Sequence, residues 1–264
     1  MASTKSELDG SRILVVGAVG GIGSAIVRRL VYSRAHVAGW DADHSVSAAG
    51  DYHGITVDCS DEAEVATATI DTIDRLGSLD AVVIASGTIG RGWLHDTALA
   101  EWQRVVDNNL TTTFLILRST LPHMFDRGGA VVTIGSTAST VVTGGGTAAS
   151  YGASKAAVLQ LTRQVGVDYA GYGIRANCVC PGWIETPFNE RSRLAAGEAW
   201  TDERLPRTDL AAPISGPGQP DDVASTVEFL LSPGASFINA SAVMVDGATP
   251  RCSSHTWPRG DSIR

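Results

Sequence analysis

A tyrosine and a lysine stand four residues apart in the segment SYGASKAAVLQLT, where Tyr151 and Lys155 are set among small and apolar residues. A helix over residues 150–170 would place them one turn apart on the same face. A phenol has a pKa of about 10 and is a poor base at neutral pH, but nearby cations favour its phenolate. Lowering that pKa by about 3 units takes roughly 4 kcal/mol, which two close cations can supply in a partly dry site. Such a tyrosine could exchange a proton with an alcohol while hydride moves. The alternative is a surface pair without chemistry.

A glycine-rich turn near the start of the chain provides a second chemical signal. The segment VGAVGGIGSAIVRRL contains Gly17, Gly21 and Gly23 between an apolar strand-like run and a helical one. In dinucleotide-binding units such glycines form the turn and let the backbone approach the pyrophosphate at a helix N-terminus. The pattern therefore predicts a dinucleotide site, with a simple tight turn as the alternative.

An acidic residue follows at the place where a dinucleotide site needs one. Asp41 ends the second apolar run, about 20 residues after the glycines, and could accept hydrogen bonds from the adenosine ribose hydroxyls. Its charge would repel a 2'-phosphate, and neither VGAVGGIG nor WDAD contains Arg or Lys. These features predict NAD rather than NADP, unless Asp41 is only a solvated turn residue. Asp58, after GITV, could approach the adenine or cap the helix expected near Ser60.

The elements that position these residues alternate between strand and helix along the chain. Helical periodicity appears in GSAIVRRLVYS, EAEVATATIDTIDRL and DDVASTVEFLL, between apolar runs that read as strands. Strands that are apolar on both faces and alternate with helices indicate a parallel sheet covered on each side. The expected fold is a single-domain, doubly wound α/β fold. The seven predicted strands span residues 12–17, 36–40, 54–57, 79–86, 129–136, 174–180 and 241–245.

Composition narrows the class of protein. The chain has 264 residues, 44% hydrophobic and 18% charged, which favours one globular domain. A net charge of -8 without a Lys/Arg-rich run argues against nucleic acid as a partner. The polar start MASTKSELDG lacks the apolar core of a secretory signal, so a cytoplasmic location is expected, with no membrane association. The four cysteines lack metal-ligand spacing and are expected to be reduced thiols, and no metal site is predicted.

Several further motifs, in one consistent order, resemble the short-chain dehydrogenase/reductase family over nearly the whole chain. They are VVGAVGGIG, IASG, VVDNNLTTTF, VVTIGS, YGASK, CVCPGWIETP and AVMVDGA. The chain departs from the family pattern in two places. Val16 replaces the threonine that often precedes the first glycine, and IASG replaces the usual Asn-Asn-Ala-Gly, whose missing asparagine normally ties the central sheet together. The local network there must therefore differ.

The resemblance implies a Rossmann-type fold and a set of catalytic residues. Ser136 would hold the substrate oxygen, Tyr151 would be the acid/base, and Lys155 would lower the pKa of the tyrosine and hold the nicotinamide ribose. Asn109, rather than its neighbour Asn108, would support a water in a proton relay. The alternatives are a strand-end turn hydroxyl for Ser136 and a polar helix residue for Asn109.

The resemblance also implies where the cofactor, NAD, would be bound. Ile184 and Thr186 would reach the nicotinamide carboxamide, although Thr186 could also be a helix N-cap. The complete set of expected cofactor-binding residues is Gly17, Val19, Gly21, Ile22, Gly23, Asp41, Asp58, Cys59, Ala85, Ser86, Gly87, Tyr151, Lys155, Pro181, Gly182, Ile184 and Thr186.

The substrate-facing residues are expected in loops beyond the carboxyl ends of the strands. The candidates suggest an apolar or aromatic substrate, with core packing or a subunit contact as the alternative for each. They are Trp93, Val141, Val142, Trp183 and Phe188. Residues 188–217 would form a lid over the bound cofactor. The segment AVLQLTRQVGVDYAGYGIRANCVCPGWIETP further resembles family members that oxidise secondary alcohols with NAD, including hydroxyalkyl-thioether dehydrogenases.

The expected activity is the NAD-dependent interconversion of a secondary alcohol and a ketone. Two alternatives stay open: an NADPH-dependent 3-oxoacyl thioester reductase, which Asp41 disfavours, and a nucleotide-binding regulatory module without catalysis. The domain is expected over residues 11–248, after a flexible segment 1–10. The tail 249–264 would pack on a neighbouring subunit or be disordered, and the family resemblance implies a homo-oligomer, most often a tetramer.

Overall fold

The computed structural model describes residues 6–48, 52–90, 93–142, 149–187 and 217–248. The expected lid, with Phe188, and the expected C-terminal tail lie outside these residues. Of the segment 1–10, which was expected to be flexible, residues 6–10 form a turn and Leu8 is buried in the core. This part of the N-terminal segment is therefore packed against the domain.

All seven strands predicted from the sequence are present and form one sheet. Their order across the sheet is β3-β2-β1-β4-β5-β6-β7, and every neighbouring pair is parallel. The fold is therefore the doubly wound, Rossmann-type α/β fold that was expected. The strands are β1 (Arg12–Val16), β2 (His36–Asp41), β3 (His53–Thr56), β4 (Ala81–Ile84), β5 (Gly129–Ile134), β6 (Ile174–Pro181) and β7 (Ala242–Val245).

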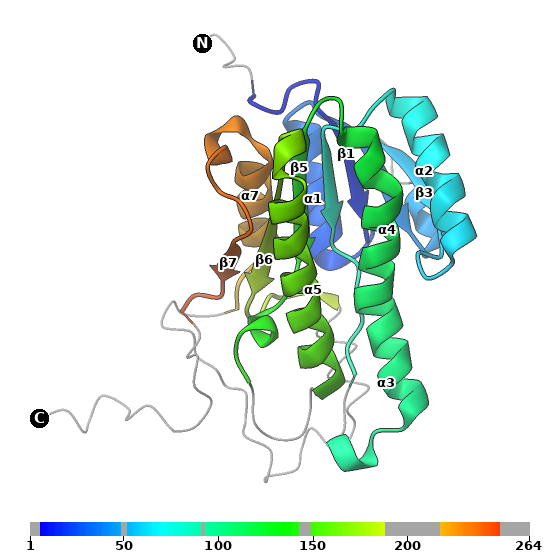
Figure 1. Cartoon of the computed structure of the whole chain (residues 1–264), viewed down its shortest axis with the longest axis vertical. Helices are drawn as coiled ribbons and strands as arrows, with labels where there is room; N and C mark the ends of the chain where they lie inside the picture. The colour runs from blue at the N-terminus through cyan, green and yellow to red at the C-terminus, as the bar shows by residue number, and fades with distance from the viewer. Residues whose placement is uncertain (1–5, 49–51, 91–92, 143–148, 188–216, 249–264) are drawn as a thin grey trace, which may run out of the picture.

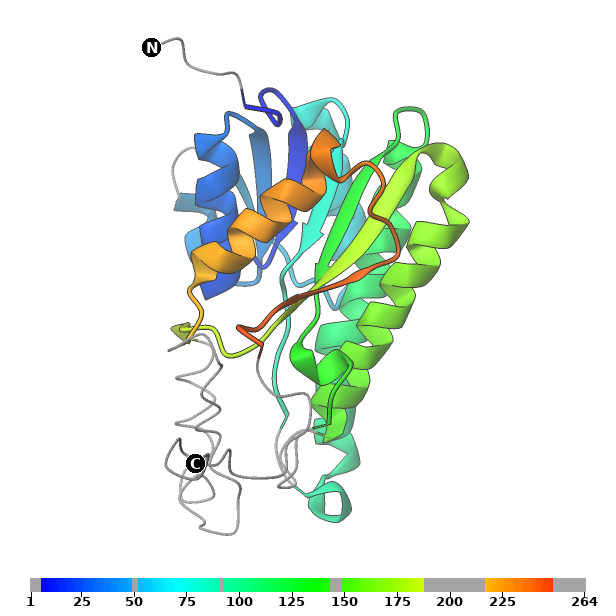
Figure 2. The ribbon, with the colours of Figure 1, turned by 90° about the vertical axis from the view of Figure 1, so that its left-hand side faces the viewer.

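Helices cover both faces of the sheet, as Figures 1 and 2 show from two directions. Helices α1 and α7 pack against each other on one face, while α2, α4 and α5 lie on the other. Their bounds are α1 (Gly21–Tyr32), α2 (Glu62–Leu76), α3 (Leu99–Val106), α4 (Thr112–Thr120), α5 (Ala149–Asp168) and α7 (Pro220–Leu231). Among the described residues, no helix is long and apolar enough to span a membrane.

The apolar strands explain this layered arrangement, because their alternate side chains enter two different cores. On β1, Ile13 and Val15 belong to the core under α1 and α7, whereas Leu14 and Val16 belong to the core under α2 and α4. All four side chains are at most 1% exposed. A strand buried on both sides in this way needs helices on both faces, which the alternating sequence provides.

The topology places the candidate site at one edge of the sheet. The chain order runs outward from β1 to β3 on one side, then returns to β4 and runs outward to β7 on the other. The direction of winding therefore changes between β1 and β4. In folds of this type, ligands bind beyond the carboxyl ends of the strands at this change of direction.

Candidate active site

The glycine turn between β1 and α1 has no room for larger side chains. A Cβ added to Gly23 would lie 1.9 Å from the carbonyl oxygen of Gly17, and Gly17 itself has a φ of +79°. A Cβ on Gly17 would lie 2.7 Å from the backbone nitrogen of Ser86. The turn is therefore tightly closed, and α1 begins directly after it, with its free amides at the carboxyl edge of the sheet.

Asp41 lies beside this turn, as the sequence predicted. The backbone N–H of Val19 donates to Oδ2 of Asp41 at 2.9 Å, and the N–H of Asp43 donates to Oδ1 at 3.1 Å. These bonds orient the carboxylate at the end of β2. Each oxygen keeps a further lone pair that could accept a hydrogen bond from a ribose hydroxyl.

The segment after β6 closes the same cradle from the opposite side. A Cβ on Gly21 would lie 2.7 Å from Cγ2 of Thr186, so this glycine allows the side chain of Thr186 to approach α1. Gly182 continues the pairing with β7, since its N–H donates to the carbonyl of Val245 at 2.9 Å. Ile184 is buried at 4% exposure.

The residues present fit a dinucleotide. The hydroxyl oxygen of Ser86 is buried without a hydrogen-bond partner in the described structure, next to the glycine turn. A buried hydroxyl that lacks a partner loses free energy on desolvation, which a bound polar ligand would recover. The glycine cradle and this hydroxyl together provide space and a hydrogen-bonding group where the fold predicts a nucleotide.

Asp58 and Cys59 lie at the adenosine side of the site, after β3. Asp58 was a candidate cap for α2, but that alternative is wrong, because Asp61 accepts from the N–H groups of Ala63 and Glu64 and caps the helix. Asp58 instead accepts from the N–H of Ser60 at 2.9 Å, and the Ser60 hydroxyl lowers the pKa of the carboxyl. Burial, with three nearby carboxylates, raises the pKa of the Cys59 thiol to about 12.

Ser136 and Tyr151 meet at the carboxyl end of β5. Ser136 follows the strand, and Tyr151 lies in the first turn of α5. The Ser136 hydroxyl lies close enough to the Tyr151 phenol to lower its pKa. The N–H of Ser136 donates to Oγ of Ser139 at 3.1 Å, and the Ser139 hydroxyl in turn donates to the carbonyl of Lys155 at 2.9 Å. The loop that carries the serine is thus tied to the helix that carries the tyrosine.

Lys155 lies one turn further along α5, with its charged end in the protein interior. The residue is 5% exposed, and Nζ donates to the carbonyl of Ile134 at 2.8 Å. Burial lowers the pKa of the Lys155 ammonium to about 8, and the nearby thiols of Cys178 and Cys180 oppose this shift. These two cysteines are free and buried, with 3.9 Å between their sulfur atoms.

The structure of the free chain does not reproduce the expected direction of the Tyr151 pKa. Burial raises the pKa of the phenol, and the hydrogen bond from Ser136 only partly offsets this effect. The expectation rested on two close cations, the Lys155 ammonium and the oxidised nicotinamide, and concerns the site with cofactor bound. In the unliganded site, desolvation disfavours the charged forms of both groups, the Tyr151 phenolate and the Lys155 ammonium.

Asn109 is held by an irregular turn between α3 and α4. Residues Asp107–Thr111 form a π-helical turn, a feature often found at functional sites. The Asn109 side-chain oxygen accepts from the N–H of Thr88 at 2.7 Å. Its amide nitrogen donates to the Thr88 carbonyl and to Oγ of Ser154, both at 2.9 Å. Asn109 is 1% exposed and faces the loop after β4, near Lys155.

The side chains of Asn109 and Lys155 both approach Gly87. A Cβ on Gly87 would lie 3.1 Å from Oδ1 of Asn109 and 3.1 Å from Nζ of Lys155. A larger residue would therefore press on both polar groups. Asn108, the less favoured candidate, instead donates to the carbonyl of Arg104 at 2.8 Å and belongs to the outer side of the turn.

The candidate substrate-facing residues are not part of the core. Trp93 is 51% exposed, Val142 is 87% exposed and Trp183 is 45% exposed, so the core alternative is wrong for these three. Val141 is partly buried, and Phe188 lies outside the described residues. The rings of Trp93 and His95 stack with centroids 6.3 Å apart. The exposed aromatic surface is thus available to a ligand or another subunit.

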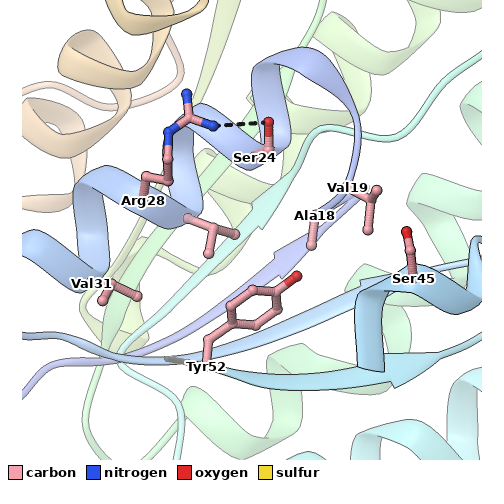
Figure 3. A pocket seen from close by; sticks show the side chains of 8 residues that line it. Ala18, Val19, Ser24, Arg28, Val31, Ser45 and Tyr52 are labelled. Carbon is pink, nitrogen blue, oxygen red and sulfur yellow. Dashed lines mark hydrogen bonds between the residues drawn. The ribbon is translucent and has the colours of Figure 1, made fainter. Parts of the chain in front are cut away.

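A pocket of about 250 Å³ adjoins the adenosine side of the cradle (Figure 3). Val19 and Ala18 form one wall, Tyr52 and Ser45 lie opposite, and Arg28 projects from α1 at the rim, where its Nη1 donates to Oγ of Ser24 at 3.4 Å. Sequence reasoning considered only the segments next to the glycines and Asp41. It therefore missed Arg28, the cation that the first helix brings to this place.

Other residues of the site also escaped sequence reasoning. Thr88, Ser139 and Ser154 each bond to an expected catalytic residue or to its backbone. The spacing of Ser154, three residues after Tyr151, could have indicated a position near the same helix face. The contacts of Thr88 and Ser139 depend on loop conformations that no local pattern specifies.

Fold and site together define a dinucleotide-binding α/β oxidoreductase, and comparison with known proteins identifies its family. A family model described as enoyl-(acyl carrier protein) reductase matches residues 17–248. The 2-(R)-hydroxypropyl-CoM dehydrogenase of Xanthobacter autotrophicus is 38% identical over 90% of this chain and 98% of its own length. The cis-4-hydroxycyclohexanecarboxylate dehydrogenase of Sinomonas cyclohexanicum is 36% identical over 89% and 94%.

A solved structure agrees with these relatives. The ligand-free aldohexose dehydrogenase of Thermoplasma acidophilum has a TM-score of 0.85 and 28% identity, covering 97% of this chain and 100% of its own. The chain belongs to the short-chain dehydrogenase/reductase family, as the sequence motifs indicated. It is accordingly an oxidoreductase of the type that acts on CH–OH groups with a nicotinamide cofactor.

Proposed function

We propose that this protein is an NAD-dependent dehydrogenase that interconverts a secondary alcohol and a ketone, with Tyr151 as the acid/base. The observation that carries the proposal is the placement of the Ser136 hydroxyl beside the Tyr151 phenol, with Lys155 one turn away on α5. A substrate oxygen placed between the two hydroxyls would be held by one and exchange its proton with the other.

The nicotinamide ring supplies the acceptor or donor of hydride, and its positive charge in the oxidised form favours the phenolate of Tyr151. In alcohol oxidation, Oη of Tyr151 takes the hydroxyl proton of the substrate. Ser136 donates a hydrogen bond to the substrate oxygen and keeps the reacting C–H directed towards the cofactor site. In ketone reduction, the same tyrosine returns the proton.

Lys155 and Asn109 assist this proton transfer without contacting the substrate oxygen themselves. The Lys155 ammonium, buried beside Ile134, favours the phenolate and would hold the nicotinamide ribose. Asn109 holds the loop that contains Gly87, where an added Cβ would lie 3.1 Å from both Oδ1 of Asn109 and Nζ of Lys155. Water bound near Lys155 could then carry protons between the site and solvent.

Asp41 supports NAD as the cofactor. Its carboxylate is oriented by the N–H groups of Val19 and Asp43, and its charge would repel a 2'-phosphate. The glycine cradle would hold the pyrophosphate, while Ile184 and Thr186 would approach the nicotinamide carboxamide. Pro181 and Gly182 would guide the chain from β6 to these two residues.

One observation favours NADP as a second candidate. Arg28 lies at the rim of the pocket beside Val19, with three hydroxyl groups nearby, and could attract a 2'-phosphate. In that case Arg28→Ala would raise the KM for NADP(H) and leave that for NAD(H) unchanged. If NAD is the cofactor, Arg28→Ala should change the KM for NAD(H) and the KM for NADP(H) little.

The substrate proposed is a small secondary alcohol with an apolar or aromatic group. The partly exposed rings of Trp93 and Trp183 could contact such a group. The two relatives named above are dehydrogenases of hydroxypropyl-CoM and of a hydroxycyclohexanecarboxylate. A thioether alcohol and a cyclic hydroxy acid are therefore the first two substrate types to test.

The test is nicotinamide absorbance during incubation with secondary alcohols and their ketones, using NAD(H) and NADP(H) separately. Turnover with NAD(H) that is lost in Tyr151→Phe supports the proposal. Tight NADH binding without turnover on any compound would instead favour a nucleotide-binding module. Size measurement in solution and cell fractionation would test the homotetramer and the cytoplasmic location that we further propose.

A further inference from the structure

The loop that follows β4, residues 85–90 (the β4 loop), lies between the cofactor cradle and the catalytic helix. At one end, Ser86 touches the space that a Cβ on Gly17 would occupy. At the other, a Cβ on Gly90 would lie 2.4 Å from Oγ of Ser150 on α5. The position of this loop therefore affects both halves of the site.

Asn109 provides the inner attachment of the β4 loop through its two hydrogen bonds to the backbone of Thr88. The family's usual asparagine pair at the end of β4 is replaced here by Ile84 and Ala85, so the loop lacks that source of hydrogen bonds. A second, outer attachment comes from α3.

Arg104 on α3 provides this outer attachment. Its Nη1 donates to Oγ1 of Thr88 and its Nη2 donates to the carbonyl of Ile89, both at 3.0 Å. The same guanidinium binds Glu101 in a fork, with Nε to Oε2 at 2.7 Å and Nη2 to Oε1 at 2.7 Å. One planar cation thus joins the helix to two successive residues of the loop.

The chemistry of this cluster suits a fixed attachment. The Arg104 side chain is 44% exposed, and an exposed ion pair by itself contributes little to stability. A guanidinium held in a fork, however, has its plane and its remaining donors fixed. Glu101 raises the pKa of Arg104, and Arg104 lowers the pKa of Glu101, so both stay charged at neutral pH.

We propose that Arg104, oriented by Glu101, is a positioning residue that holds the β4 loop and, through Thr88, sets Asn109 and Gly87 against Lys155. This inference rests on the proposed function where its readout is turnover. The links from α3 towards the catalytic lysine are the bond from Arg104 to Thr88 and the bond from Thr88 to Asn109. They end at Gly87, where an added Cβ would lie 3.1 Å from both Oδ1 of Asn109 and Nζ of Lys155.

The experiment compares Arg104→Ala and Arg104→Lys with Arg127→Ala in the full chain. Arg127 is a matched control, since it is also half-exposed and pairs with a carboxylate, Asp80, just before β4 at the amino edge of the sheet. Arg104→Ala should lower kcat about tenfold with NADH affinity within about twofold of wild type, since small misplacements cost much rate.

Arg104→Lys separates geometry from charge. One ammonium cannot reach Glu101, Thr88 and Ile89 in the same arrangement, so this variant should resemble Arg104→Ala. Full rescue by lysine would overturn the proposed fork. Glu101→Gln should also reduce kcat. The double variant with Arg104→Ala should lose little more, because both changes release the same attachment of the β4 loop.

Amide hydrogen exchange gives a readout without turnover. The N–H of Thr88 bonds to Asn109, so peptides covering residues 86–90 should exchange faster in Arg104→Ala than in wild type or Arg127→Ala. Unchanged exchange would overturn the attachment, and faster exchange with unchanged kcat would overturn the positioning role. If wild type shows no turnover, the proposed function fails, while hydrogen exchange still decides whether Arg104 holds the loop.

Discussion

The backbone N–H of Val19 donates to the carboxylate of Asp41 at 2.9 Å, so the turn after β1 is bonded directly to the end of β2. Two features that the sequence separates by twenty-two positions are therefore one structural unit. A change at Asp41 removes a charge from the proposed adenosine site and also one restraint on the glycine turn.

Asp41→Ala should relax the preference for NAD. Without the carboxylate, repulsion of a 2'-phosphate disappears and the ribose hydroxyls lose an acceptor, so kcat/KM should fall for NAD(H) and rise for NADP(H). A combined change of about tenfold or more in the ratio corresponds to about 1.4 kcal/mol. An unchanged ratio, measured by steady-state kinetics with both cofactors, would mean that other residues read the ribose.

Tyr151→Phe should remove turnover and preserve cofactor binding. The variant keeps the ring but has no hydroxyl to exchange a proton, so kcat should fall by about a thousandfold, within the range for general acid–base catalysis. NADH affinity, measured by fluorescence titration, should stay within about twofold. Retention of a tenth of the wild-type rate would contradict the assigned role.

Lys155→Met should change how stability depends on pH. Burial lowers the pKa of Lys155 to about 8, well below that of an exposed lysine. Below that pH both folded and unfolded chains carry the ammonium, and the folded chain bears its desolvation cost. Above it, the folded chain loses the proton first, so wild-type stability rises with pH until the unfolded lysine also titrates near 10.4.

The variant lacks this dependence. The free energy of unfolding of wild type, relative to Lys155→Met, should therefore increase by roughly 2 to 3 kcal/mol between pH 7 and pH 10. Urea unfolding of the unliganded proteins at several pH values measures the difference. The lost bond to Ile134 lowers the variant's stability equally at every pH and does not affect the slope. A constant difference would show that the lysine is not desolvated.

Gly23→Ala should destabilise the fold. Its Cβ would lie 1.9 Å from a backbone oxygen of Gly17, which cannot move without opening the turn, so we expect a loss of about 3 kcal/mol. Gly152→Ala is the matched control. Among the residues that the structure describes, its Cβ would meet nothing nearer than the Ala138 carbonyl oxygen at 3.8 Å. Alanine is the better helix former within α5 and should be neutral or stabilising there. Similar thermal shifts for both variants would contradict this account.

The sequence predicted the fold well, because each strand of the parallel sheet is an apolar run flanked by helical periodicity. Ile13 and Leu14 enter opposite cores, and such two-sided burial leaves a clear pattern in the sequence. Ser136, Tyr151 and Asp41 were found for a related reason. They lie where a strand ends or a helix begins, and these positions follow from the elements themselves.

What the sequence did not predict depends on contacts between loops and distant elements. Arg28 reaches the pocket beside Val19 only because α1 packs against β2. Arg104 reaches Thr88 only because of the conformation of the β4 loop. The raised pKa of Tyr151 in the free chain was not predicted, because spacing reveals a neighbouring cation but not the desolvation of both groups.

The π-helical turn at Asp107–Thr111 also determines the angular phase of the two helices that it joins. A π turn holds one residue more than the α-helical turn it replaces, so every side chain of α4 is rotated by about 100° relative to a continuous helix from α3. Deleting one residue here would restore regular winding and direct Asn109 away from Thr88. Length, as well as residue identity, is therefore part of the information that this short stretch carries.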